Sequence, residues 1–408
     1  MLSSISLYNP IKKLPVKTNI GRIKSIDLLR GTVMIIMAID HVRDYFHAPA
    51  FLYDPTDLKH TTIPIFLTRW ITHFCAPVFV FLAGVSANLY GSKRTKKQLS
   101  WFLFSRGVWL IFAEMFIITL EWSFNASYHF FLMQVIWVTG FSMIVLSALV
   151  FLNTYFVLAI GLLIIFTHNL LDPIHVSGKG VNAFLWSLFH EPGNFTFGYF
   201  NFQVRYSFLP WIGIISAGYA AGSLYKKEFD VELRKKLLFI FGISAIVLFV
   251  TLRSFNNYGD SAIWQIQKNP VFTFLSLLNV TKYPPSLLYI LMTLGPTLIF
   301  LAIAEVPLNK WTSRISVFGR VPFFYYVLHI ALIHSMATIA ATISGYNATA
   351  MILTSRVNQS AELKGYGFNL MVVYLIWITV LLILYPLCKW FDKYKRNNVA
   401  EKWWLSYL

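Results

Sequence analysis

The sequence predicts an all-α membrane protein, a polytopic helical bundle of about ten transmembrane helices. Two observations support that prediction. Only 12% of the 408 residues are charged, against about 25% in a typical soluble protein, and 57% are hydrophobic. In addition, apolar runs of about 18 to 22 residues recur along the chain, which is the length a helix needs to cross a hydrocarbon core about 30 Å thick. A soluble domain of this length could not bury so much apolar surface.

The apolar runs give the expected positions of the spans. The fifth run is short, and residues 271–280 are expected to form a re-entrant or interfacial piece instead of a full span. The expected spans are residues 27–46, 70–90, 101–120, 130–150, 154–168, 208–225, 236–253, 286–304, 317–341 and 367–388.

Basic residues predict how the spans are oriented. Cytoplasmic connections of membrane proteins carry an excess of lysine and arginine. Here the basic clusters precede the first span, follow the second, lie between the sixth and the seventh, and follow the tenth. An even number of spans separates each cluster from the N-terminus, so all four clusters lie on the same side of the membrane as the N-terminus. Both termini are therefore expected in the cytoplasm. The clusters are Lys12, Lys13, Lys17, Arg22 and Lys24; Lys93, Arg94, Lys96 and Lys97; Lys226, Lys227, Arg234, Lys235 and Lys236; and Lys389, Lys393, Lys395 and Arg396.

A single domain is expected, because no internal repeat or low-complexity tract divides the chain. Residues 1–24 are expected to be a basic cytoplasmic segment, 25–390 a transmembrane domain, and 391–408 a basic tail that lies along the lipid bilayer. The connections on the opposite side are long and poor in lysine and arginine, and long ordered loops are usually functional. We therefore expect an elaborated extracytoplasmic face, formed by residues 47–69, 169–207, 254–285 and 342–366.

Charge and cysteine usage exclude several other classes. The net charge of +17 would suit nucleic acid, but the basic residues form short clusters between apolar runs, so no nucleic acid is expected to bind. Cys75 and Cys388 are the only cysteines and lie far apart within apolar runs, so no disulfide framework is expected. The histidines lack the spacing of a metal motif, and no metal is expected. The polar first 24 residues argue against a cleavable signal peptide.

Ionisable side chains within the first span need an explanation, because each costs roughly 2.5–3.5 kcal/mol at the centre of a membrane helix. Arg30 and His41 are eleven residues apart. That separation is close to three helical turns, so they share one face and lie about 16 Å apart along the axis. Arg30 is expected near the cytoplasmic end and His41 towards the far side. Asp40 and Asp44 are four residues apart and also share a face.

The second span brings more polar groups to the same depth. Arg69 and His73, four residues apart, open it on one face. Two histidines, two arginines and two acids are thus expected at one level. The alternative for Arg69 is a side chain that snorkels to the interface. Gly84 and Ser86, later in this span, are expected to serve close helix packing only.

Two later residues join the candidates. Lys282 directly precedes the eighth span on the outer side, and His329 lies in the ninth. The alternative for His329 is a packed, neutral histidine bonded to a backbone carbonyl. Aromatic residues of the outer loops, such as Trp264 and Tyr283, suit stacking on sugar rings, but an interfacial aromatic belt predicts the same residues.

Three stretches together resemble a known family. Residues 22–31, followed by Met34, Met37, Asp40 and His41, resemble the first-helix motif of the heparan-alpha-glucosaminide N-acetyltransferase catalytic-domain family. Residues 69–86 are similar to that family's second-helix motif, and residues 318–329 to its late helix. The resemblance covers most of the chain, is strongest over residues 22–90, and is to the bacterial-type members.

The resemblance implies a transmembrane acyltransferase of a bacterial cell membrane. Its co-substrate would be cytosolic acetyl-CoA, and its acceptor a sugar amine or hydroxyl on the extracytoplasmic side. Members of the wider superfamily have a basic residue, ten others and then a histidine, and Arg30 and His41 have that spacing. The resemblance thus implies that His41 is catalytic and that Arg30 helps to hold the CoA phosphates or organises the pore entrance.

This sequence departs from the family pattern at one place. In the lysosomal enzyme the first helix leads to an asparagine, and the catalytic histidine follows in the next loop. The position matching that asparagine is His41 here, and the loop histidine is His47. Both remain candidates for the base.

Acetyl transfer needs a base and donors for the developing oxyanion. We expect Asp40 or Asp44 to orient His41, and Arg69, His73, Asp44, Lys282 and His329 to bind the acceptor or the oxyanion. Direct transfer and an acetyl-histidine intermediate both fit the sequence. The sequence is also compatible with a homodimer. The competing interpretation is a proton-coupled transporter or flippase with the paired charges as a relay, although the sequence lacks the duplicated halves of many transporters.

Overall fold

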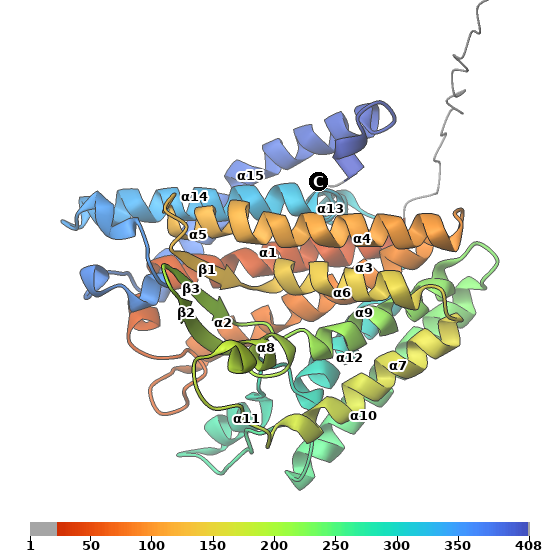
Figure 1. Cartoon of the computed structure of the whole chain (residues 1–408), viewed down its shortest axis with the longest axis horizontal. Helices are drawn as coiled ribbons and strands as arrows, with labels where there is room; N and C mark the ends of the chain where they lie inside the picture. The colour runs from red at the N-terminus through yellow and green to blue at the C-terminus, as the bar shows by residue number, and fades with distance from the viewer. Residues whose placement is uncertain (1–22, 407–408) are drawn as a thin grey trace, which may run out of the picture.

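The computed structural model describes residues 23–406, and these are mostly helical. The basic residues Lys12, Lys13, Lys17 and Arg22 lie outside the described residues. The α-helices are α1 (Lys24–Phe46), α2 (Ile63–Ile71), α3 (Cys75–Gly91), α4 (Lys96–Phe112), α5 (Thr119–Ser123), α6 (Val135–Leu149), α7 (Thr154–Thr167), α8 (Val181–Phe189), α9 (Leu209–Ala221), α10 (Val231–Phe255), α11 (Pro270–Leu278), α12 (Leu287–Ile303), α13 (Lys310–Arg320), α14 (Pro322–Ile343) and α15 (Leu370–Asn398). They form one bundle, with α15 on one flank and α10 on the other (Figure 1).

A small sheet at one end of the bundle departs from the predicted all-α class (Figure 1). Strand β3 (Phe200–Val204) lies between β1 (Phe130–Met133), to which it is parallel, and β2 (Gly193–Phe197), to which it is antiparallel. Residues 130–133 were expected to begin the fourth span. They are continuous with the apolar run of α6, and the periodicity of a short apolar run does not distinguish a strand from a helix.

Two expected spans contain a break. The span expected at 317–341 is divided at Val321 into α13 and α14, because Pro322 has no backbone N–H to continue a helix but suits the first helical position. The second span begins earlier than expected, at Ile63, and passes through a 3₁₀ turn, Thr72–Phe74, before α3. Residues 271–280, expected to be re-entrant or interfacial, form the short helix α11.

Within residues 23–406, six helical segments are long and apolar enough to cross a membrane, and the chain is therefore a membrane protein. This number is smaller than the predicted ten. Helix α1 is not among the six because it carries several charged residues, and α6 and α12 are apolar but shorter. The six are Ile63–Gly91, Lys96–Ser123, Thr154–Leu171, Val231–Phe255, Pro322–Ile343 and Leu370–Asn398.

Glycines bring the helices near the site into backbone contact. A Cβ atom on Gly31 of α1 would lie 2.1 Å from the carbonyl oxygen of Ile315 in α13, and one on Gly84 of α3 would lie 2.1 Å from that of Ile215 in α9. Only glycine permits such an approach. The expected packing role of Gly84 is confirmed. Helix α1 also packs against α3, α14 and α15, so the helix with the ionisable residues lies inside the bundle.

Candidate active site

One face of α1 lines two cavities in succession. Arg30 and Met34 line the first, which we call the Arg30 cavity, and Met37 and His41 line the second, the His41 cavity. These four residues are spaced by four, three and four positions, so they form one stripe along the helix. The predicted shared face of Arg30 and His41 is therefore confirmed.

The His41 cavity is lined by charged side chains from α1, α2 and four loops. Among the described residues, five cations and three carboxylates line it, so positive charge is in excess. Asp40, Asp44 and Arg69, which were expected to lie at the same depth, line this one cavity together, and Lys282 lines it as well. The charged lining residues are Asp40, Arg43, Asp44, Asp54, Arg69, Arg205, Lys282 and Arg356.

His41 is bonded to a histidine from the far end of the sequence. Its Nδ1 lies 2.7 Å from Nε2 of His329 on α14, and Nδ1 of His329 lies 2.6 Å from the carbonyl oxygen of Tyr326. A carbonyl oxygen only accepts, so Nδ1 of His329 donates and, in the neutral ring, its Nε2 accepts. His41 therefore donates from Nδ1 and keeps the lone pair on its own Nε2. This is the tautomer that a general base needs.

Arginines hold both acids of α1. Asp40 pairs with Arg69 of α2 and, at 2.9 Å, with Arg43. Arg43 also lies 2.7 Å from Asp44, which Arg356 approaches to 3.8 Å. Charge-assisted bonds of this kind are strong and directional, so the network fixes the end of α1 that lines the His41 cavity.

The structure corrects the expected partner of His41. Asp40 or Asp44 was expected to orient the ring, but both carboxylates bond to guanidinium groups, which offer several donors in a fixed fork. The Nδ1 of His41 bonds to His329 instead. Aromatic rings complete its surroundings: Trp122 lies edge-on at 5.0 Å between ring centroids, and Tyr326 at 6.3 Å.

Two cations of the cavity wall flank an aromatic ring. The Nζ of Lys282 lies 5.3 Å from the centroid of the Tyr283 ring, and the guanidinium carbon of Arg205 lies 4.5 Å from it. Lys282 is only 9% exposed. Neither cation has a carboxylate within 4 Å among residues 23–406. Burial raises the pKa of Tyr283, but Lys282, Arg69 and Arg205 outweigh burial and lower that pKa to about 7.

His47 does not face the same cavity as His41. It follows the last residue of α1, is 2% exposed, and lines a separate groove with Phe368. Burial, with a smaller contribution from Arg43, lowers the pKa of His47 to about 4. The geometry thus favours His41 over His47 as the base.

Two residues expected to bind substrate lie behind the cavity wall. His73 is buried and packs its ring 5.5 Å from that of Tyr289, whose hydroxyl donates to the backbone oxygen of His73. His329 is fully buried behind His41. Neither lines the His41 cavity, so both are positioned to support other residues.

The Arg30 cavity is lined by cations as well. Arg30 donates to the hydroxyl oxygen of Ser86 at 3.1 Å and to the carbonyl oxygen of Gly319 at 3.2 Å. Ser86, expected to serve packing only, also lines this cavity, because α3 turns it towards Arg30. The cationic lining residues are Arg30, Arg106, Arg320 and Lys395.

Sequence reasoning missed several residues of the His41 cavity. Asp54, Trp122 and Arg356 lie at helix ends or in loops, where periodicity gives no information. One signal was present for Arg356, because it is the single arginine of the long connection 342–366.

The bundle and the His41 cavity together define a membrane protein with a buried polar centre suited to acid–base chemistry. Within residues 23–406, no group of three or more His, Cys, Asp or Glu side chains is arranged to hold a metal ion.

The family model for heparan-alpha-glucosaminide N-acetyltransferase, catalytic, matches residues 22–251, more than half of the chain, and the protein belongs to this family. It is a family of membrane acetyltransferases. The match includes Arg30, His41 and Arg69 but ends before Lys282 and His329. No curated protein matches the chain.

Proposed function

We propose that this protein moves an acetyl group from cytosolic acetyl-CoA to a sugar or glycan on the extracytoplasmic side of a bacterial cell membrane. Family membership supports the class of reaction. The observation that carries the proposal is the His41–His329 pair, which leaves an unprotonated imidazole nitrogen on a residue that lines a charged cavity.

In this proposal the chain crosses the membrane about ten times, with α1, α6, α9 and α12 adding to the six longer segments, and both termini are cytoplasmic. The connections from α3 to α4 and from α9 to α10, which are basic, lie at the same end of the bundle as the start of α1 (Figure 1). This agrees with an excess of positive charge on the cytoplasmic side. The sheet lies at the opposite end.

Acetyl-CoA binds from the cytoplasmic end, with its phosphates in the Arg30 cavity. The four cationic side chains of that cavity support this assignment, because guanidinium groups match phosphate oxygens in geometry and charge. The thioester arm follows the stripe of α1 from Met34 past Met37 and brings the acetyl carbonyl to His41.

His41 acts as the general base. Its Nε2 takes the proton of the acceptor amine or hydroxyl while the electron pair of that nitrogen or oxygen attacks the thioester carbonyl carbon. Arg69 donates to the oxyanion that develops. When the tetrahedral intermediate collapses, the C–S bond breaks, and CoA leaves as a thiol with the proton from His41. His329 acts only by holding Nδ1 of His41.

The same tautomer also suits a two-step reaction. Nε2 of His41 then attacks the thioester carbonyl carbon, the C–S bond breaks, and CoA leaves as a thiolate. The acceptor next takes the acetyl group from the acetyl-histidine, which restores neutral His41, and the proton that the acceptor loses neutralises the CoA thiolate. Protein-bound label after incubation with radiolabelled acetyl-CoA, in the absence of acceptor, distinguishes this course from direct transfer.

The acceptor carries a negatively charged group. Lys282 supports this, because it lines the cavity, is nine-tenths buried and has no carboxylate within 4 Å among the described residues. An unpaired buried cation is costly, and an anionic ligand offsets that cost. The same cations, Lys282, Arg69 and Arg205, also lower the pKa of the Tyr283 hydroxyl.

The alternative is a proton-coupled transporter or flippase, which two cavities along one helix would also suit. Purified protein in proteoliposomes, supplied with radiolabelled acetyl-CoA and a panel of amino sugars, separates the two functions. The proposal predicts CoA release that depends on the acceptor and yields labelled sugar. Uptake of unmodified sugar without CoA release would replace the acyltransferase with the transporter.

A further inference from the structure

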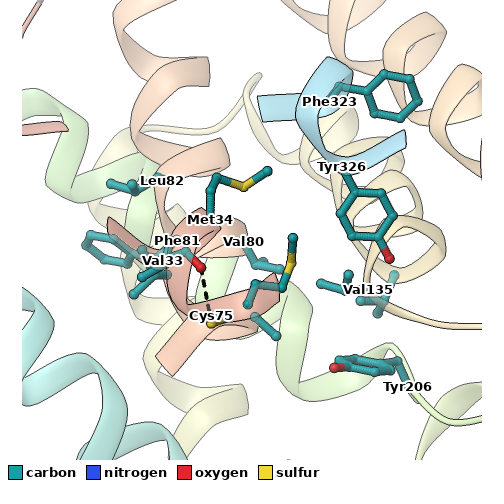
Figure 2. Packing of buried hydrophobic residues seen from close by; sticks show 14 of the residues in the cluster. Val33, Met34, Cys75, Val80, Phe81, Leu82, Val135, Tyr206, Phe323 and Tyr326 are labelled. Carbon is teal, nitrogen blue, oxygen red and sulfur yellow. Dashed lines mark hydrogen bonds between the residues drawn. The ribbon is translucent and has the colours of Figure 1, made fainter. Parts of the chain in front are cut away.

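Three side chains line both cavities and therefore separate them. They are Phe79 of α3, Val135 at the start of α6 and Tyr326 of α14. Figure 2 shows Tyr326 reaching towards Val135 across the space between their helices. Because the three come from three different helices, they close the passage from several sides. We call them the barrier.

The barrier is directly connected to the histidine pair. The ring of Tyr326 lies 6.3 Å from the ring of His41 and 5.3 Å from that of His329, and its carbonyl oxygen accepts the Nδ1 proton of His329. Tyr326 and Val135 are buried. A thioester that reaches His41 from the Arg30 cavity has to pass next to these side chains.

A buried glutamate fixes the position of Val135. One carboxylate oxygen of Glu114 accepts the backbone N–H of Trp137, in the first turn of α6, at 2.9 Å. Glu114 lies in a π-helical segment, Ala113–Ile118, and such segments often occur at functional sites. The first turn of α6, which includes Val135, is thus held by the Glu114 side chain as well as by helix packing.

The width of the acyl group decides whether it passes such a barrier. The acyl end of the thioester arrives first, and a linear acyl group is no wider than the arm behind it. A branched group carries an extra methyl beside the carbonyl, and close-packed side chains yield little to added volume.

We propose that Phe79, Val135 and Tyr326 admit linear acyl thioesters to His41 and exclude branched ones, and that they shield the thioester from the water of the His41 cavity. This inference rests on the proposed acyl transfer. It adds a donor specificity that depends on the width of the acyl group and not on its length. This specificity is set by residues outside the charged network.

The first test compares Val135→Ala with Val138→Ala. Val138 is fully buried in the same helix but lines neither cavity, so it controls for the loss of two methyl groups. With acetyl-CoA and isobutyryl-CoA as donors, Val135→Ala is expected to raise the ratio of isobutyryl to acetyl transfer about tenfold or more. It is also expected to raise hydrolysis of acetyl-CoA without acceptor. If Val135→Ala, Val138→Ala and the wild type all give the same ratio of isobutyryl to acetyl transfer, the proposed exclusion of branched acyl groups is wrong.

A second test does not need enzyme activity. Cys75 lines the His41 cavity, and Cys388→Ser leaves it as the single cysteine. A membrane-impermeant methanethiosulfonate is applied to inside-out and to right-side-out vesicles. Cys75 is expected to react from one side only, and from both sides once Val135→Ala is added. If Cys75 reacts equally fast from the two sides before that substitution, the barrier is overturned. If Cys75 reacts from one side only and Val135→Ala does not change this, the barrier is also overturned.

The two tests separate the proposals. If the wild type neither releases CoA nor binds acetyl-CoA, the proposed function fails, while the labelling of Cys75 still reports whether the cavities are separate.

Discussion

Nδ1 of His41 and Nε2 of His329 lie 2.7 Å apart, although 288 residues separate them in the sequence. His329 also donates to the carbonyl oxygen of Tyr326, so the pair has one arrangement of protons when both rings are neutral. The lone pair of His41 is thus fixed by α14 and not by the carboxylates beside it on α1. The proposed acyl transfer depends on this relationship.

Removal of the positioning histidine should affect turnover more than binding. His329→Phe is expected to lower kcat about a hundredfold with little change in the KM for acetyl-CoA, because His41 is then free to adopt the wrong tautomer. His329→Gln is expected to recover part of the loss, since its amide oxygen accepts the Nδ1 proton. Initial rates of CoA release measure both. Full activity of the Phe variant would show that His329 only packs.

The buried ion pair of Asp40 and Arg69 should be coupled in stability. Arg69→Met is expected to cost about 3 kcal/mol of unfolding free energy, because it leaves a buried carboxylate with one partner fewer. The double variant with Asp40→Asn should be less destabilised than Arg69→Met alone. Thermal unfolding in detergent measures this, and strictly additive losses would contradict the coupling.

Lys282 should recognise charge on the acceptor. Lys282→Ala is expected to raise the KM for an amino sugar bearing a phosphate or carboxylate about tenfold, and to leave the KM for a neutral amino sugar unchanged. Lys268→Ala is the matched control, because Lys268 stacks on Phe272 outside the cavity. A similar loss for charged and neutral acceptors would exclude a role in charge recognition.

Tyr283 should make acceptor preference depend on pH. With a pKa of about 7, its hydroxyl is neutral at lower pH and negative at higher pH, where it cancels part of the charge of Lys282 and Arg205. The preference for anionic over neutral acceptors, as a ratio of kcat/KM values, is therefore expected to fall as pH rises through 7. Tyr283→Phe should remove this dependence. If the Phe variant keeps the same pH profile, another group titrates.

Arg30 should contribute to binding of the CoA phosphates. Arg30→Gln is expected to raise the KM for acetyl-CoA about tenfold. Acetyl-pantetheine, which carries no phosphate, should show no such increase and serves as the internal control. An equal increase for both donors would mean that the substitution disturbs the packing of α1 against α13.

The parts of the site that sequence predicted are those set by local periodicity. Arg30 and His41 share a face because a helix repeats every 3.6 residues, whatever surrounds it. The apolar length of the spans likewise located most helices. The charges of α1 cost stability in a membrane, so their presence indicated a site before any contact was known.

The parts that sequence did not predict depend on contacts between distant segments. Nothing in the neighbourhood of His41 indicates that His329, and not Asp40, bonds to its ring. The sheet arises from pairing between residues 130–133 and 200–204, which local propensity does not specify. Arg356 reaches the cavity from a loop. In a loop, neither hydrophobic periodicity nor secondary-structure propensity predicts where a side chain lies.

The most direct measurement compares CoA release by the wild type, His41→Ala and His47→Ala in the same proteoliposomes with acetyl-CoA and an amino sugar. We predict that His41→Ala loses activity at least a hundredfold, whereas His47→Ala, whose histidine lines a different groove, keeps most of it. Loss in His47→Ala with activity retained in His41→Ala would contradict the assignment of His41 as the base.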